Sequence, residues 1–145
     1  MKRFSLVRTG FNLVAVCLAI GGLAGCQSEE EIKRQKYFAA GQRVYVQNCA
    51  NCHQRDGSGL EALYPPLKGA DYLQNKEKVI CLIRHGLNGP IVVNGKRYNR
   101  PMPANPQLAD IDVATLTTYV YNQWGGEKVI TDVKTVSRVL EGCEK

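Results

Sequence analysis

The sequence has few residues that could bind a metal through nitrogen or a thioether, since it contains only two histidines and two methionines in 145 residues. It also lacks a long apolar stretch. The run from 11 to 25 is apolar for about fifteen residues, and a transmembrane helix needs roughly 20. Lysines and arginines are scattered, without the basic block or aromatic platform of a nucleic-acid-binding protein. These absences argue against an uncleaved membrane span and against nucleic acid as a partner.

The first 25 residues have the composition of an export signal. They contain three basic residues, Lys2, Arg3 and Arg8, no acidic residue, and then the apolar run. The stretch ends in LAGC, which resembles the lipobox of bacterial lipoproteins, where the cysteine becomes the lipid-carrying N-terminus. We therefore predict a signal peptide over 1–25 and a lipid on Cys26. The mature protein would be exported and anchored to a membrane, facing the periplasm or the cell exterior.

Removal of the signal changes the charge and leaves one small domain. The whole chain has 19 basic and 13 acidic residues, and without the three basic residues of the signal the balance is 16 to 13. The stretch 26–36 is polar and rich in charge, and we interpret it as a solvated tether. A domain over 37–126 and an extension over 127–145 follow, and about 120 mature residues suffice for one domain.

A cysteine motif carries the strongest chemical signal. Apart from Cys17 in the signal and the predicted lipid carrier, the chain has four cysteines: Cys49, Cys52, Cys81 and Cys143. Two of them lie in NCANCHQ, residues 48–54, and C-x-x-C-H is the attachment sequence for c-type haem. Two thiols one helical turn apart reach the two vinyl groups of a porphyrin, and the adjacent imidazole falls beneath the iron. The motif predicts one haem c, attached through Cys49 and Cys52, with His53 as the proximal iron ligand.

Zinc is the main alternative at this motif, because the four cysteines could supply four thiolates. The export signal argues against zinc, since free thiolates tend to oxidise outside the cytoplasm. A zinc site would also leave His53 without a role, and the sequence has no second C-x-x-C. A thioredoxin-like redox pair is weaker still, because no alternating strand and helix pattern surrounds the motif.

An electron-transfer haem needs a second axial ligand, and the mature chain offers two candidates. Met1 leaves with the signal, so Met102 is the one methionine that remains. It lies in RPMPAN, where the flanking prolines restrict the backbone of a loop. His85 is the rival, although a histidine just before Gly86 also suits the C-terminal end of a helix. We favour Met102, whose thioether would raise the reduction potential relative to two histidines.

Four segments together resemble the monohaem class I cytochromes c, of the bacterial periplasmic type. They are GQRVYVQNCANCHQRDGSGL, YPPLKGADYL, KVICLIRHGLNGPIVVNGKRYNRPMPAN and LTTYVYNQWG, in that order from about residue 40 to 125. The resemblance implies a haem packed among helices, with thioether bonds to Cys49 and Cys52. It also implies His53 and Met102 as axial ligands and a carbonyl of Pro66 that accepts the ring N–H of His53.

The expected fold is an all-α, cytochrome c-like helical domain around one haem, with a short hairpin before the methionine loop. Helices are expected over 37–48, 77–85 and about 113–124. A glycine inside the first helix suggests a close helix crossing, and the resemblance implies that Gly41 and Tyr45 pack there against Tyr119 and Trp124 of the last. IVVNGKRY has the Asn-Gly signature of a tight hairpin. Candidates for the haem pocket are Leu67, Tyr72, Leu82, Ile83, Leu87, Ile91 and Tyr98, and each would equally suit a plain apolar core.

Three features depart from the family pattern. Ala109 stands where a Ser or Thr helix cap is expected, so Asp110 would have to cap instead. The extension carries apolar residues at helical spacing, which predicts an amphipathic helix that covers the domain or binds a partner: Val129, Val133, Val136 and Leu140. The remaining pair, Cys81 and Cys143, predicts a disulfide in an oxidising compartment, which would pin the extension to the 77–85 helix.

A haem iron with two protein ligands has no open site, so the protein should shuttle single electrons and bind no small-molecule substrate. We expect a membrane-anchored carrier between a respiratory donor and a terminal oxidase or reductase. Four basic residues could guide an acidic partner or merely solubilise the surface: Lys68, Lys96, Arg97 and Arg100. Two alternatives stay open. One is a small haem peroxidase with a five-coordinate iron, and the other is a haem-bearing subunit of a larger complex.

Overall fold

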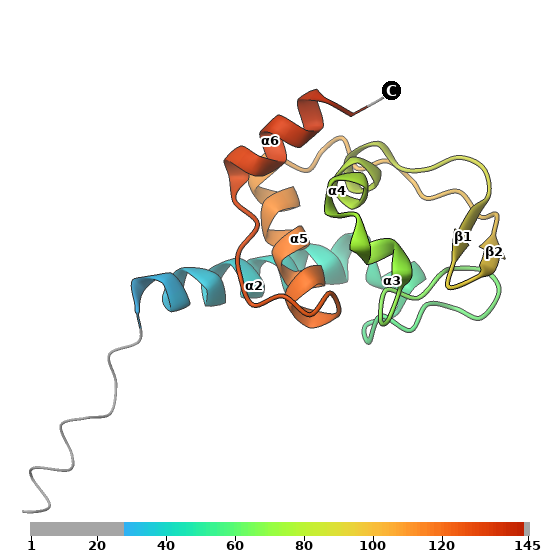
Figure 1. Ribbon diagram of the computed structural model, residues 1–145, viewed down its shortest axis with the longest axis horizontal. Helices are drawn as coiled ribbons and strands as arrows, with labels where there is room; N and C mark the ends of the chain where they lie inside the picture. The colour runs from blue at the N-terminus through green and yellow to red at the C-terminus, as the bar shows by residue number, and fades with distance from the viewer. Residues whose placement is uncertain (1–27, 144–145) are drawn as a thin grey trace, which may run out of the picture.

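The computed structural model describes residues 28–143 as helices linked by long loops, with one small hairpin (Figure 1). The predicted signal 1–25 and the predicted lipid site Cys26 lie outside the described residues. In order, the elements are α2 (Glu29–Asn48), α3 (Ala50–His53), the 3₁₀ helix η1 (Asp71–Gln74), α4 (Lys76–His85), β1 (Ile91–Val93), β2 (Lys96–Tyr98), α5 (Asp110–Gln123) and α6 (Val133–Glu141). No helix within 28–143 is long and apolar enough to cross a membrane.

The crossing of α2 and α5 is the centre of the fold, as the sequence predicted (Figure 1). Gly41 lies so close to α5 that a Cβ on it would be 1.9 Å from the carbonyl oxygen of Thr115. Beside this contact Tyr45 packs against Tyr119 and Trp124, with ring centroids 5.3 and 5.2 Å apart. Since α4 and α6 also pack on α5, every residue of α5 from 113 to 122 is buried.

Helix α2 begins at Glu29, eight residues before its predicted start. The side chain of Ser28 caps the helix by accepting a hydrogen bond from the amide of Glu31 at 3.2 Å. Acidic side chains in the first turn complement the helix dipole. Arg34 pairs with Glu31 and donates to Asn122 of α5 at 2.9 Å. The polar composition of this stretch reflects exposure of one helical face, so the interpretation as a solvated tether is wrong for residues 29–36.

The hairpin forms where the Asn-Gly pair predicted it, with Ile91 opposite Tyr98. Asn94 and Gly95 have φ of 51° and 74°, the left-handed conformations that a tight two-residue turn requires. The turn is also tied to the start of η1, because Asp71 and Asn94 each donate a backbone N–H to the other's side chain at 2.9 Å. The hairpin therefore has a fixed place although its strands are short.

The start of α5 differs from the expected cap. Ala109 occupies the cap position and has no side chain that could accept, and Asp110 does not replace it. Instead the carboxylate of Asp112 accepts the amide of Ala109 at 3.0 Å. The carboxylate of Asp110 is engaged elsewhere, by Arg84 at 2.8 Å and Ser137 at 2.6 Å. The hydroxyl of Ser137 and, to a smaller extent, Arg84 hold the pKa of Asp110 below its ordinary value.

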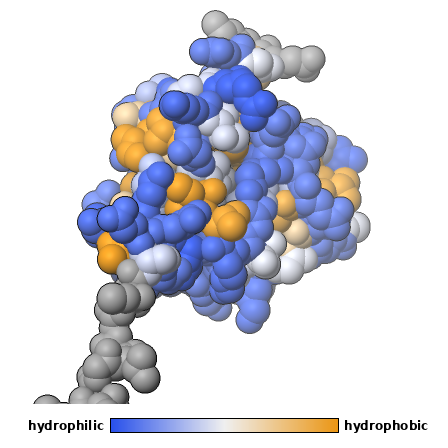
Figure 2. Space-filling view, turned by 60° about the vertical axis from the view of Figure 1, so that its left-hand side comes forward, coloured by the Kyte–Doolittle hydropathy of each residue, from blue (hydrophilic) through white to orange (hydrophobic). Residues whose placement is uncertain are grey.

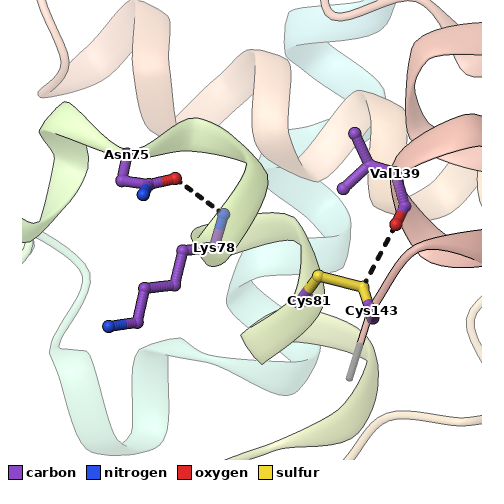
Figure 3. Close-up of a disulfide and its surroundings, with 5 residues drawn as sticks. All are labelled: Asn75, Lys78, Cys81, Val139 and Cys143. Carbon is purple, nitrogen blue, oxygen red and sulfur yellow. Dashed lines mark hydrogen bonds between the residues drawn. A yellow bond between two sulfur atoms is a disulfide. The ribbon is translucent and has the colours of Figure 1, made fainter. Parts of the chain in front are cut away.

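The extension packs back on the domain through α6 (Figure 1). Asp132 caps the helix, and Val136 is fully buried at the centre of its inner face. Val129, predicted to share that face, is 59% exposed, because α6 begins only at Val133. Closer to the helix, the amide of Thr131 donates to the buried hydroxyl of Thr118 at 2.8 Å. The structure contains the Cys81–Cys143 disulfide between α4 and the end of the chain (Figure 3).

Replacing Gly41 by alanine should destabilise the folded protein, because the new methyl group would meet the backbone of α5 and the two helices would have to separate. We expect a loss of about 1 to 3 kcal/mol in the free energy of unfolding, measured by urea denaturation of the haem-loaded protein. Gly142→Ala is the control, since its Cβ would lie an ordinary 3.6 Å from the nearest atom. Equal losses for the two variants would show that the helices do not meet as closely as described.

Candidate haem-binding site

The two cysteines of C-x-x-C-H lie on one helical turn directly after α2. Cys49 ends α2 and begins α3, and its carbonyl oxygen accepts the amides of Cys52 and His53 at 3.1 and 2.9 Å. Both thiols are partly buried and are the free thiols within 28–143, whereas the other two cysteines are bonded. Burial raises the pKa of the Cys49 thiol to about 12. The site therefore presents two free thiols one turn apart, as thioether attachment to one porphyrin requires.

His53 has one ring nitrogen committed and one free. Its Nδ1–H donates to the carbonyl of Pro65 at 3.0 Å, which fixes the ring and leaves Nε2 to bind a metal. Burial of the ring lowers the pKa of His53, and the hydrogen bond to Pro65 offsets only part of that effect. The imidazole is thus neutral near pH 7, which is the form that ligates iron.

The acceptor is Pro65, which corrects the prediction of Pro66. A tight turn sets this register, because Leu60 and Tyr64 exchange two backbone hydrogen bonds at 3.0 and 3.2 Å. Gly59 then packs against the backbone of Pro65, so that a Cβ on Gly59 would lie 2.7 Å from the carbonyl oxygen of Pro65. The resemblance implied Pro66, the second of two adjacent prolines. Only the position of the turn decides which carbonyl faces the ring.

The loop after His53 is held by the α2–α5 crossing. The hydroxyl of Tyr45 donates to the carbonyl of Gln54 at 2.5 Å, where α3 ends. Gly57 lies against the indole of Trp124, so close that a Cβ would be 2.6 Å from the ring. The carbonyl of Gly57 accepts the amides of Leu67 and Lys68 at 2.8 and 3.0 Å. The aromatic cluster of the core thereby fixes both the cysteine motif and the segment that carries Pro65.

Met102 lies on a loop attached to the C-terminal end of α4. Leu87 and Met102 exchange two backbone hydrogen bonds, each 2.9 Å long. Gly86 permits the close approach, because a Cβ there would lie 2.4 Å from the carbonyl oxygen of Met102. After Met102, the loop is attached to α4 again through Asn105. Its side-chain N–H donates to the carbonyl of Ile83, and its backbone N–H donates to the carbonyl of Arg84. Asn105 was not singled out from the sequence, although asparagine side chains commonly form hydrogen bonds to the backbone of turns.

The rival ligand is placed differently. His85 is an exposed side chain in the last turn of α4, followed by Gly86 as the helix ends. Met102 is partly buried. This placement favours Met102, because an iron ligand must be shielded in a pocket with the porphyrin, and it gives His85 the ordinary position of a helix-end histidine.

The predicted pocket residues fall into two groups. Ile83 and Tyr98 are buried in the core, and Tyr98 pairs with Ile91 across the hairpin. The others are partly buried, so their apolar surface is still available to a flat apolar ligand: Leu67, Tyr72, Leu82, Leu87 and Ile91. The two free thiols, the oriented imidazole and this apolar lining fit a covalently bound haem. Fold and site together define a small helical domain of the c-type haem class.

Comparisons with known proteins agree. The sequence model of the family described as "Cytochrome c" matches residues 38–124. The chain is 34% identical to a cytochrome c-552 of Thermus thermophilus, over 81% of this chain and 74% of that protein. It is 36% identical to a second Thermus thermophilus cytochrome c-552, over 66% of this chain and 76% of that protein. A cytochrome c subunit of a quinone alcohol dehydrogenase from Gluconacetobacter polyoxogenes is 30% identical, over 60% of this chain and 19% of the subunit.

The chain therefore belongs to the cytochrome c family, and the helical fold predicted from the sequence is confirmed. Members of this family bind a covalently attached haem c, which contains iron, and transfer electrons. The predicted cofactor and the monohaem class I resemblance are likewise confirmed.

Proposed function

We propose that the protein is a lipid-anchored, one-electron carrier that moves electrons between a respiratory donor and a terminal oxidase or reductase. In this proposal Cys49 and Cys52 would hold the haem through thioether bonds, and His53 and Met102 would be the two protein ligands of its iron. The observation that carries it is the oriented imidazole: Nδ1 of His53 is held by Pro65 at 3.0 Å, so Nε2 is the one ring nitrogen left for iron. With the thioether of Met102 as sixth ligand, no position stays open for substrate.

The anchor would hold the domain close to the membrane. Ser28, the helix cap, follows Cys26 by only two residues, so this stretch spans at most about 7 Å. Helix α2 then extends for 20 residues, about 30 Å, to the cysteine motif. A lipid at one end and the haem at the other would place the redox centre above the membrane surface, within reach of membrane-bound partners.

A subunit of a larger dehydrogenase complex is the second candidate, because relatives include cytochrome c subunits of alcohol and gluconate dehydrogenases. An uncovered apolar face on α6 would favour it. That face is packed instead, with Val136 buried and the other apolar residues of α6 partly buried. On the face in Figure 2, apolar side chains form separate patches divided by hydrophilic ones. We therefore favour the free carrier, and stoichiometric co-purification with a dehydrogenase would favour the subunit.

The axial ligand can be tested by optical spectroscopy of the oxidised haem-loaded protein. Sulfur ligation to ferric haem produces a weak band near the red end of the visible spectrum. We expect the band in the wild type and in His85→Ala, and its loss in Met102→Ala. A low-spin wild type without the band would point to His85, whereas high-spin features would reopen the peroxidase alternative.

The anchor can be tested by fractionating cells that produce the full chain. Wild-type protein should be found in the membrane fraction and be extracted by detergent. Cys26→Ser should appear in the soluble fraction with an unchanged haem spectrum, because the substitution removes the site of lipid attachment and leaves the domain intact. Wild-type protein that washes off membranes in high salt would contradict a lipid anchor.

The basic residues near the site can be tested with small redox reagents, independently of any partner. Lys68 and Arg97 are exposed side chains, one beside the cysteine-motif loop and one on β2. A positive field at the haem edge would speed reaction with ferricyanide at low salt and slow it with hexaammineruthenium, and salt would weaken both effects. Lys68→Gln/Arg97→Gln should lose most of this salt dependence, and Lys128→Gln, an exposed control, should keep it. If the double variant and the control have the same salt dependence, Lys68 and Arg97 do not guide redox reagents to the haem and are ordinary solvent-exposed charges.

A further inference from the structure

The family match ends at residue 124, yet the chain continues into α6. We propose that α6 is a brace that holds α4, and through α4 the Met102 loop, so that Arg84, Asp110 and Ser137 are positioning residues for the axial ligand. The part that concerns iron rests on the proposed ligation by Met102. The mechanical part, from α6 to the loop, stands on contacts within the described residues.

The first step is the attachment of α6 to α4. The disulfide joins Cys81, in the middle of α4, to Cys143, just beyond α6, with the two Cα atoms 5.8 Å apart (Figure 3). The Sγ of Cys143 also lies 3.4 Å from the carbonyl oxygen of Val139, so residue 143 lies against the last turn of α6. Residue 143 can therefore not move away from α4 while the disulfide is intact.

The second step is a polar junction of three helices. Asp110, at the start of α5, accepts a hydrogen bond from Arg84 of α4 on one carboxylate oxygen and from Ser137 of α6 on the other. These bonds are 2.8 and 2.6 Å long. These bonds fix Arg84, which is the residue before His85, the last residue of α4. Loss of the hydroxyl of Ser137 would leave one carboxylate oxygen of Asp110 without its partner. It would also loosen the hydrogen bond between the other oxygen and the guanidinium of Arg84.

The third step is the dependence of the Met102 loop on that end of α4. The carbonyl oxygens of Ile83 and Arg84 accept from Asn105 at 3.0 and 3.1 Å. Leu87, two residues after the helix, exchanges two backbone bonds with Met102. The loop is therefore attached to α4 on both sides of the methionine. Movement of the last turn of α4 would be transmitted directly to the backbone of Met102.

The brace predicts a local effect that a general loss of stability would not produce. A Met102–iron bond in a loop that opens by itself should break before the protein unfolds. In Ser137→Ala and in Cys81→Ser/Cys143→Ser, we expect the backbone amides of Leu87, Met102 and Asn105 to exchange with solvent at least about tenfold faster. Amides of the α2–α5 crossing, such as those of Tyr45 and Val120, should keep their relative protection.

The experiment is hydrogen exchange followed by NMR on the haem-loaded protein, together with urea titration of the sulfur–iron absorption band. In the wild type the band should disappear together with unfolding, measured by far-ultraviolet circular dichroism. In Ser137→Ala and the double cysteine variant it should disappear at lower urea than unfolding. Ser137→Thr, which keeps the hydroxyl, should restore wild-type behaviour. Thr135→Ala, which removes a hydroxyl from the same helix and leaves the bonds of Asp110 in place, is the matched control.

Two outcomes would overturn the brace. One is a uniform increase in exchange at the loop and at the helix crossing, and the other is loss of the band together with unfolding in every variant. Failure of the ligation proposal would look different, since the wild type would then have no band. The exchange rates at Leu87 and Asn105 would still decide the mechanical part.

Discussion

The site depends on the contact between the backbones of α2 and α5 at Gly41. Because no side chain separates the helices there, Tyr45 and Trp124 can pack against each other just beyond the crossing. Each of these aromatics then holds part of the cysteine-motif loop, Tyr45 through the carbonyl of Gln54 and Trp124 through contact with Gly57. The two thiols and the imidazole are placed by core packing, and rigidly held ligands are what an iron site requires.

The opposite wall of the site is built differently. The Met102 loop has little regular structure, and it gains its position from hydrogen bonds to the end of α4 and from the glycine and prolines that shape it. Helix α4 is in turn held by its buried Ile80 and Ile83, by the Asp110 junction and by the disulfide. One proposed iron ligand thus belongs to the part of the molecule fixed by the core, and the other belongs to a part that is also contacted by α6, beyond the matched family domain.

Local patterns were enough to predict the cysteine motif and the hairpin, because a fixed spacing carries the first and a turn dipeptide carries the second. The helix crossing was predicted from the glycine inside the first helix together with the resemblance to class I cytochromes c, since its aromatics would otherwise suit any core. Two kinds of feature could not be predicted. The acceptor for His53 depends on the position of a separate turn, which makes Pro65 and Pro66 indistinguishable in sequence. The role of Asp110 depends on Arg84 and Ser137, which are distant in the chain and meet only when three helices pack. The early start of α2 was missed because a charged helical face and a charged linker have the same composition.

The central claim is that the iron is saturated by two protein ligands and exchanges one electron at a time. Potentiometric titration of the haem-loaded protein, followed by addition of carbon monoxide to the reduced form at neutral pH, tests it most directly. We expect a single one-electron transition and an absorption spectrum that carbon monoxide leaves unchanged. A rapid spectral shift on adding carbon monoxide would mean that the sixth position is open, and it would contradict the assignment of the protein as an electron carrier with no substrate site.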